Sequence, residues 1–183
     1  MTSAAVTLFG TEIGSIAWDT GQELGFFEYH PAFLRSGIEV APIHMPLAEG
    51  VYQFPGLPRD TFKGLPGLLA DCLPDKFGNL LIDQWLTREG RTAASFNPVE
   101  RLCYLGSRAM GALEFLPAHH TGQPDRELQI DALINLANTV LADRQKLQTT
   151  FVPEHEEEAL ADILRVGTSA GGARAKAVVA WNP

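Results

Sequence analysis

Cysteine is scarce in this sequence, and the two that occur, Cys72 and Cys103, lie far apart. Two distant cysteines supply neither a disulfide framework nor the paired thiolates of a structural zinc site. Their neighbours in the sequence are apolar. We therefore expect buried, reduced thiols, as in a cytoplasmic protein.

Long apolar runs are also missing. No stretch approaches the roughly 20 residues needed to span a bilayer. The N-terminus lacks the basic region and apolar run of a signal peptide. We expect a soluble, cytoplasmic protein that does not contact a membrane.

Basic residues are outnumbered, since 14 Lys and Arg face 22 Asp and Glu, for a formal net charge of −8. Non-specific binding of nucleic acid depends on contacts between phosphates and Lys or Arg, so an acidic chain is a poor non-specific binder. This balance disfavours direct DNA binding.

The first part of the chain has the pattern of an antiparallel sheet. Residues 4–9, 13–18 and 26–29 read as strands because they are rich in β-branched, apolar and aromatic side chains. A turn is expected over residues 10–14. The simplest account is a β-meander, followed over 41–58 by a proline- and glycine-rich stretch of loops and short extended pieces.

Helical spacing appears next. Apolar residues recur at helical intervals over 65–86, where Pro74 and Gly78 predict a helix, a turn and a second helix. Another helix is expected to begin after Asn97, with Asn97 as its N-cap and Pro98 in its first turn. A strand over 112–116 should end at Pro117.

The polar stretch 119–125 is the best candidate for a domain boundary. Helices are expected over 130–141 and 154–165, followed by a glycine-rich loop over 167–176 and a strand over 177–181. The expected fold is α+β, with a first domain over 1–118 and a second, incomplete unit over 125–183. A final strand without a later partner suggests that the natural chain continues past Pro183.

The loop over 167–176 carries the sharpest chemical signal. Glycine permits a tight turn, and successive backbone N–H groups in such a turn cradle anionic phosphate. The loop leads into a strand, as kinase glycine-rich loops do, and does not match a Walker A loop. Taken alone, a pair of glycines between a helix and a strand is more often a plain connector. The phosphate-contacting run would comprise Gly171, Gly172, Ala173, Arg174, Ala175 and Lys176.

Four segments in order resemble the HipA family of serine/threonine kinase toxins. They are the opening hairpin with Phe27-Glu28-Tyr29, the Leu73-Pro74-Asp75 segment, the Met110-Gly111-Ala112-Leu113 strand and the loop Thr168-Ser169-Ala170-Gly171-Gly172. The resemblance covers roughly residues 6–181. It implies the N-terminal subdomain of that family followed by the start of a kinase N-lobe.

The resemblance also implies a function for the complete protein. It would be a type II toxin that uses ATP and Mg²⁺ to phosphorylate a cellular protein, an aminoacyl-tRNA synthetase in the known type. A HipB-like helix-turn-helix antitoxin would neutralise it and would make the only, indirect, link to DNA. Ser169 would be the autophosphorylation site.

Several kinase parts are missing from this sequence. It has no motif like His-Arg-Asp or Asp-Phe-Gly, so no catalytic residue is assigned. The 183-residue chain is expected to be catalytically inactive on its own. In the family, those parts lie beyond the equivalent of Pro183. Lys176 lies at the exit of the loop and is not assigned the role of the kinase lysine.

Other polar clusters have simpler interpretations. Asp71, Asp75 and Asp83 flank a helix break, where a carboxylate site is possible in principle but a capping role for Asp75 is favoured. His119 and His120 lack ligands at metal-binding spacing, so no metal site is assigned.

Two rival functions remain open. In the first, the chain is a non-catalytic binding module that restrains a separate HipA-like kinase. In the second, it is an unrelated nucleotide-binding enzyme that shares only the glycine-rich loop with the HipA family. The sequence downstream of residue 183 would separate the first rival from a kinase.

Overall fold

The computed structural model describes residues 2–88, 90–109 and 111–117. The chain divides into two compact units, of which the first comprises Met1–Leu73 and Phe96–His120 and the second comprises Pro74–Ser95 and Thr121–Pro183. The predicted boundary over 119–125 and the predicted kinase-like N-lobe lie outside the described residues.

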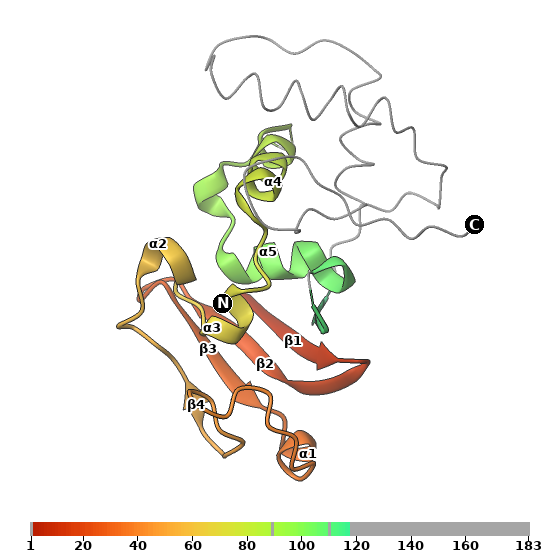
Figure 1. The fold of residues 1–183 in the computed structure, drawn as a ribbon. Helices are drawn as coiled ribbons and strands as arrows, with labels where there is room; N and C mark the ends of the chain where they lie inside the picture. Colours follow the sequence, from red (N-terminus) through yellow and green to blue (C-terminus); the bar gives the residue numbers. More distant parts are fainter. Residues whose placement is uncertain (1, 89, 110, 118–183) are drawn as a thin grey trace, which may run out of the picture. The chain divides into compact units, whose positions relative to one another are not determined.

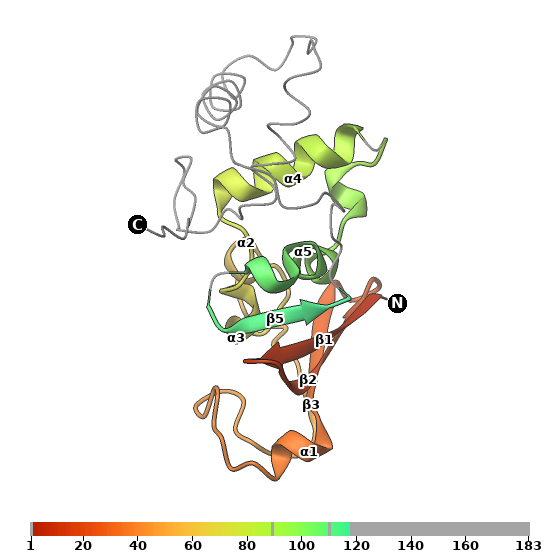
Figure 2. The ribbon, with the colours of Figure 1, turned by 90° about the vertical axis from the view of Figure 1, so that its right-hand side faces the viewer.

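The first unit contains a five-stranded antiparallel sheet with the order β4-β3-β2-β1-β5. The strands are β1 (Thr2–Leu8), β2 (Thr11–Asp19), β3 (Leu24–Tyr29), β4 (Val51–Tyr52) and β5 (Leu113–Leu116). Figure 1 shows β1, β2 and β3 as neighbours, and Figure 2 shows β5 alongside β1. The predicted meander is confirmed, and β5 joins it from the far end of the described chain.

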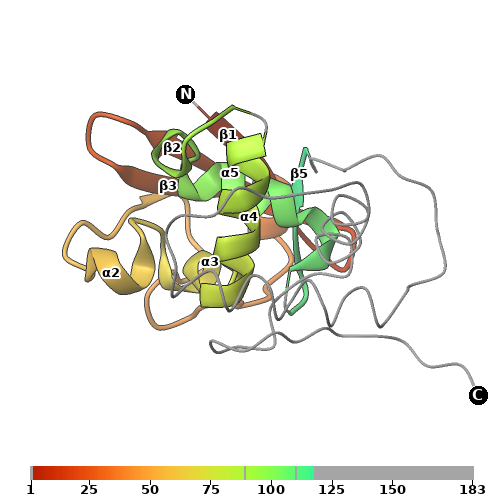
Figure 3. The same cartoon turned by 90° about the horizontal axis from the view of Figure 1, so that it is seen from above.

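Short helices accompany the sheet, so the described part of the chain has the α+β fold expected from the sequence. In the first unit they are α1 (Pro31–Leu34), α2 (Arg59–Phe62), α3 (Gly67–Ala70) and α5 (Pro98–Leu105), which leads into the short turn η2 (Gly106–Arg108). Helix α5 contacts β1, β2 and β5, and Figure 2 shows it next to β5. Helices α2 and α3 contact each other, and Figure 3 shows them as neighbours.

Helix α5 begins as the sequence predicts. The Asn97 side chain accepts a hydrogen bond from the Glu100 backbone N–H at 3.0 Å, and the Glu100 carboxylate accepts one from the Asn97 N–H at 2.8 Å. This reciprocal capping box satisfies two otherwise unpaired donors. Pro98 follows in the first turn, where its missing N–H costs nothing.

The core of the first unit lies between the sheet and these helices. Its completely buried side chains include Val6, Ile16 and Phe27 from the sheet and Leu69 and Leu102 from the helices. Alternating strand residues and one face of α5 supply it, as expected for an amphipathic sheet packed against an amphipathic helix.

In the second unit, the described elements are α4 (Lys76–Arg88) and the short turn η1 (Ala93–Ser95). The sequence correctly predicts a break near Pro74. The prediction that Gly78 also breaks the helix is wrong, because Gly78 lies in the first turn of α4. There its N–H donates to the Asp75 carboxylate at 2.8 Å.

The first turn also differs from expectation. Phe9 and Gly10 form it with backbone φ angles of +49° and +78°, so the turn is tighter than the predicted 10–14 stretch. Gly14 lies inside β2, opposite Tyr29 of β3. An added Cβ there would collide with the Glu28 carbonyl oxygen and come within 2.7 Å of the Phe27 ring. Gly14 is therefore required for close strand packing and not for a turn.

We expect Gly14→Ala to lower the free energy of unfolding by about 1–3 kcal/mol, because a buried strand must shift to make room for the methyl group. Urea unfolding followed by circular dichroism measures this. Gly56→Ala is the matched control, since a Cβ at Gly56 has no neighbour within 4 Å. Equal stability of the two variants would contradict the packing argument.

Candidate functional site: an apolar pocket

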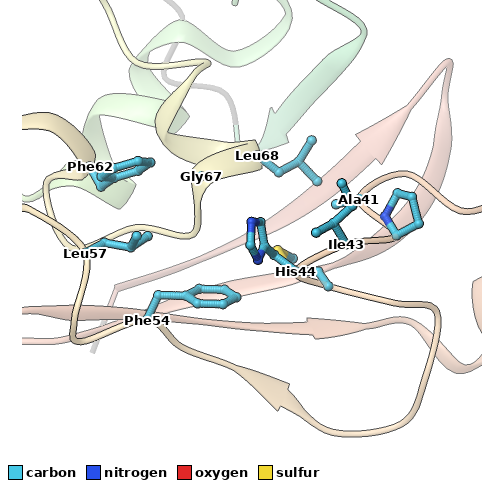
Figure 4. Close-up of a pocket in the computed structure, with 10 residues that line it drawn as sticks. Ala41, Ile43, His44, Phe54, Leu57, Phe62, Gly67 and Leu68 are labelled. Atoms are coloured by element: carbon cyan, nitrogen blue, oxygen red, sulfur yellow. The ribbon is translucent and has the colours of Figure 1, made fainter.

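The strongest candidate site in the described part of the chain is a pocket of about 370 Å³ in the first unit. It is lined by residues 41–45, by Phe54 and Leu57, by Phe62 of α2 and by residues 67–68 of α3. Figure 4 shows Phe62, Leu57 and Phe54 on one side and His44 and Ile43 on the other. His44 is the one titratable side chain among these lining residues.

One wall of the pocket is a narrow turn held by backbone pairing. Ala41 and Met45 form an antiparallel bridge, and the Met45 N–H donates to the Ala41 carbonyl at 2.8 Å. The residues between them are pushed outward, so Ile43 is 84% exposed while Met45 is only 1% exposed. The turn thus presents Ile43 and His44 to solvent and anchors itself through Met45.

Tyr29 ties this wall to the sheet. Its hydroxyl donates to the Met45 carbonyl at 2.8 Å in a buried setting. Burial raises the pKa of Tyr29 to about 12, with smaller contributions from Tyr52 and Glu39. The hydroxyl therefore keeps its proton and remains a donor at physiological pH.

Two further side chains hold the continuation of the turn. The Tyr52 hydroxyl donates to the Pro46 carbonyl at 2.5 Å, and the Leu47 N–H donates to the Glu39 carboxylate at 3.0 Å. Tyr29 and Tyr52 also meet edge to face, with ring centroids 5.8 Å apart. The wall is therefore fixed by side chains from β3, β4 and the preceding loop.

The opposite wall is fixed by Arg59 of α2. Its guanidinium donates to the Glu23 carbonyl and, at 2.9 Å, to the Gln22 carbonyl. The Gly25 N–H also donates to the Gly64 carbonyl at 2.8 Å. These contacts hold α2, and with it Phe62, against the turn between β2 and β3.

The residues that line the pocket are suited to binding a ligand and not to catalysis. Apolar walls with one histidine offer van der Waals contact and a single hydrogen-bonding group. Among the described residues there is no cluster of three or more His, Cys, Asp or Glu side chains able to hold a metal ion. The arrangement fits an apolar ligand and not a phosphate.

The residues that the sequence assigned to ATP and to autophosphorylation, residues 171–176 and Ser169, lie outside the described residues, as do His119 and His120. The favoured interpretation of Asp75 is confirmed, because its carboxylate caps the start of α4. Asp71 is an exposed residue at the end of α3.

Sequence reasoning missed the pocket. It treated residues 41–58 as loops because proline and glycine recur there, and it assigned these residues no role. The available signal was the presence of large apolar residues, such as Ile43, Phe54 and Leu57, in a stretch otherwise typical of solvent-exposed loops.

Comparison with known protein families identifies the family of this chain. A family model described as the HipA N-terminal domain matches residues 4–116, which is more than half of the chain. The chain belongs to the HipA N-terminal domain family. No curated protein matches it significantly.

In this HipA-family chain, the match covers strands β2 to β5 completely and β1 from residue 4 onward. It also covers every residue that lines the pocket. The family resemblance inferred from the sequence is thereby confirmed for the N-terminal domain. Among the described residues, no helix is both long and apolar enough to cross a membrane.

Removing each tyrosine hydroxyl should reveal how the pocket wall is held. We expect Tyr29→Phe to cost about 1–3 kcal/mol of unfolding free energy, since it leaves the buried Met45 carbonyl without its donor. Tyr52→Phe should cost less, because water can reach the more exposed Pro46 carbonyl. Urea unfolding compares the two, and a larger loss for Tyr52→Phe would contradict this account.

The two cysteines should be inert in the folded chain. Burial, with a smaller contribution from a nearby carboxylate, raises the pKa of Cys72 and of Cys103 from 9.0 to about 11. The native protein should therefore not react with a thiol reagent at pH 8, whereas the unfolded protein should react at both positions. Because the unfolded thiols ionise first, stability should fall as the pH rises from about 9 to 11. Rapid labelling of the native chain at pH 8 would show the burial to be wrong.

Proposed function

We propose that the chain is the N-terminal part of a HipA-like serine/threonine kinase of a type II toxin–antitoxin system. The observation that carries the proposal is the match of the HipA N-terminal domain to residues 4–116. The glycine-rich segment 167–176 supports it, because it follows that domain in the order expected for the start of a kinase N-lobe. The protein would act in the cytoplasm.

In this proposal the segment at 171–176 surrounds the phosphates of ATP, with Mg²⁺ as the counter-ion. Backbone N–H groups next to Gly171 and Gly172 would bind phosphate oxygens. When bound, ATP would supply the phosphoryl group and Mg²⁺ would offset the negative charge of its phosphates. The proposed substrate is a cellular protein of the aminoacyl-tRNA synthetase type, and the proposed partner is a HipB-like antitoxin that links the kinase to DNA.

Ser169 is the proposed regulatory residue. A phosphate group adds about −1.5 to −2 charges at neutral pH. On Ser169 it would repel the nucleotide phosphates and would find cationic partners in Arg165 or Arg174. Phosphorylation would then bias the loop between two arrangements.

The test of the kinase proposal is phosphosite mapping. The complete gene product that contains this chain, incubated with ATP and Mg²⁺, should acquire phosphate on Ser169. The Ser169→Ala variant should lose that phosphopeptide, while Thr168→Ala, which removes the neighbouring hydroxyl, should retain it. The 183-residue chain alone, without kinase motifs, should transfer no label. Absence of phosphate from Ser169 in the complete protein would count against the regulatory role, and failure to phosphorylate any protein would count against the kinase.

A second candidate is a non-catalytic module that restrains a separate HipA-like kinase. It is supported by one observation, namely that the domain matched by the family model, over residues 4–116, is the N-terminal domain and not the catalytic part. In that case, co-expression of the chain should relieve the growth arrest caused by the kinase encoded beside it. A chain that gives no relief and forms no complex with that kinase would eliminate this candidate.

A further inference from the structure

The segment of residues 38–49, which we call the strap, runs between α1 and β4 (Figure 1) and carries one wall of the pocket. Met45 is its one buried residue. Val40, Ala41 and Leu47 are half-buried against the core, and every other side chain of the strap is exposed. The strap is therefore anchored mainly by a single side chain.

The strap is tied to itself. The Met45 N–H donates to the Ala41 carbonyl at 2.8 Å, and the Leu47 N–H donates to the Glu39 carboxylate at 3.0 Å. Both bonds join residues inside the segment, so neither has to break if the segment moves away from the sheet. Such internal ties allow the strap to move as one body.

Few hydrogen bonds join the strap to the rest of the described chain. At its start the Ile38 N–H donates to the nearby Ser36 hydroxyl. Among the described residues, the other bonds of this kind are those from the hydroxyls of Tyr29 and Tyr52 to strap carbonyls. A segment held by one buried side chain and two hydrogen bonds to the sheet opens at a lower free energy than the sheet itself.

A glycine adjoins each end of the strap. Gly37 and Gly50 have φ angles of +70° and +134°, which lie in the region that favours glycine. A Cβ added at either position would meet nothing within 4 Å. Hinges are a few loop residues, often small ones, that absorb a change in φ and ψ. Two glycines in open surroundings therefore give the strap a hinge at each end.

The group that holds Met45 does not depend on the strap for its position. The Tyr29 ring packs against the rings of Phe27, Phe33 and Tyr52, with centroids 4.9, 6.0 and 5.8 Å away. These rings belong to β3, α1 and β4, so they stay in place when the strap leaves. The Tyr29 hydroxyl is thus kept in position to donate again when the Met45 carbonyl returns.

We propose that the strap opens and closes as a unit on hinges at Gly37 and Gly50. Its latch is the hydrogen bond from the Tyr29 hydroxyl to the Met45 carbonyl. Opening withdraws the Met45 side chain from the core and carries one wall of the pocket away from the other. The pocket is complete only in the closed state, so a molecule that occupied it would hold the strap closed. The proposal concerns the described domain and does not depend on the proposed kinase activity.

The test is thiol labelling of the folded Met45→Cys chain. The thiol introduced at position 45 should react at least roughly tenfold faster than the native Cys72 and Cys103, which are buried outside the strap. Low urea should hardly change its rate, because opening the strap exposes little surface. Leu69→Cys, at a completely buried position of α3, is the matched control and should react as slowly as the native thiols. Equal rates at positions 45 and 69 that rise together with urea would overturn the proposal.

Two further substitutions in the Met45→Cys chain test the latch and a hinge separately. Tyr29→Phe should speed labelling at position 45 roughly tenfold, because opening then breaks one hydrogen bond fewer. Gly37→Ala should speed it roughly fivefold, because opening relieves the left-handed φ of the alanine. Gly56→Ala, at an uncrowded glycine outside the strap, should leave the rate unchanged. Unchanged labelling in the first two variants would refute the latch and the hinge.

Oxidation of Met45 in the unaltered chain tests the strap without any substitution in the core. Hydrogen peroxide should convert the Met45 thioether to its sulfoxide while the domain stays folded. The rate should be insensitive to low urea, because strap opening and not unfolding admits the reagent. Peptide mass spectrometry follows the product. Oxidation that occurs only at urea concentrations that unfold the domain would show that the strap does not open by itself.

Discussion

The buried hydrogen bond from the Tyr29 hydroxyl to the Met45 carbonyl is the contact on which the pocket depends. Tyr29 belongs to β3, which pairs with both β2 and β4, so its position is set by the sheet. Met45 closes the turn that carries Ile43 and His44. A turn rich in proline has few internal hydrogen bonds of its own. Its shape is therefore imposed mainly by side chains of the sheet, Tyr29 from β3 and Tyr52 from β4.

Local patterns in the sequence were sufficient where local physics decides. The capping box at Asn97 and Glu100 follows from residues three apart, and the strands of the meander follow from alternating apolar and β-branched side chains. Gly14 and Gly78 were misinterpreted because glycine was taken as a break. In both cases the neighbours are decisive: Phe27 and Glu28 crowd Gly14, and the Asp75 carboxylate starts the helix around Gly78. The contact that decides the role of Gly14 is made with another strand, whereas the contact that decides the role of Gly78 is a local helix cap.

The pocket could not be predicted from the sequence for a different reason. Phe54, Phe62 and Leu68 come from three separate segments, and none has a periodicity that predicts a shared cavity. They meet because Arg59 attaches α2 to the carbonyls of the turn between β2 and β3. Long-range contacts of one arginine with backbone oxygens leave no pattern in a single sequence, so the structure is required to see them.

The chemistry of the pocket differs from that of a phosphoryl-transfer site. A phosphoryl-transfer site needs cations and backbone donors directed at phosphate, whereas the pocket offers aromatic and aliphatic surface with carboxylates in the surrounding segment. The proposed chemistry with ATP therefore belongs to the glycine-rich segment that follows the domain matched by the family model. An apolar pocket and a phosphoryl-transfer site place opposite demands on their surroundings, which is a physical reason to keep them in separate parts of the chain.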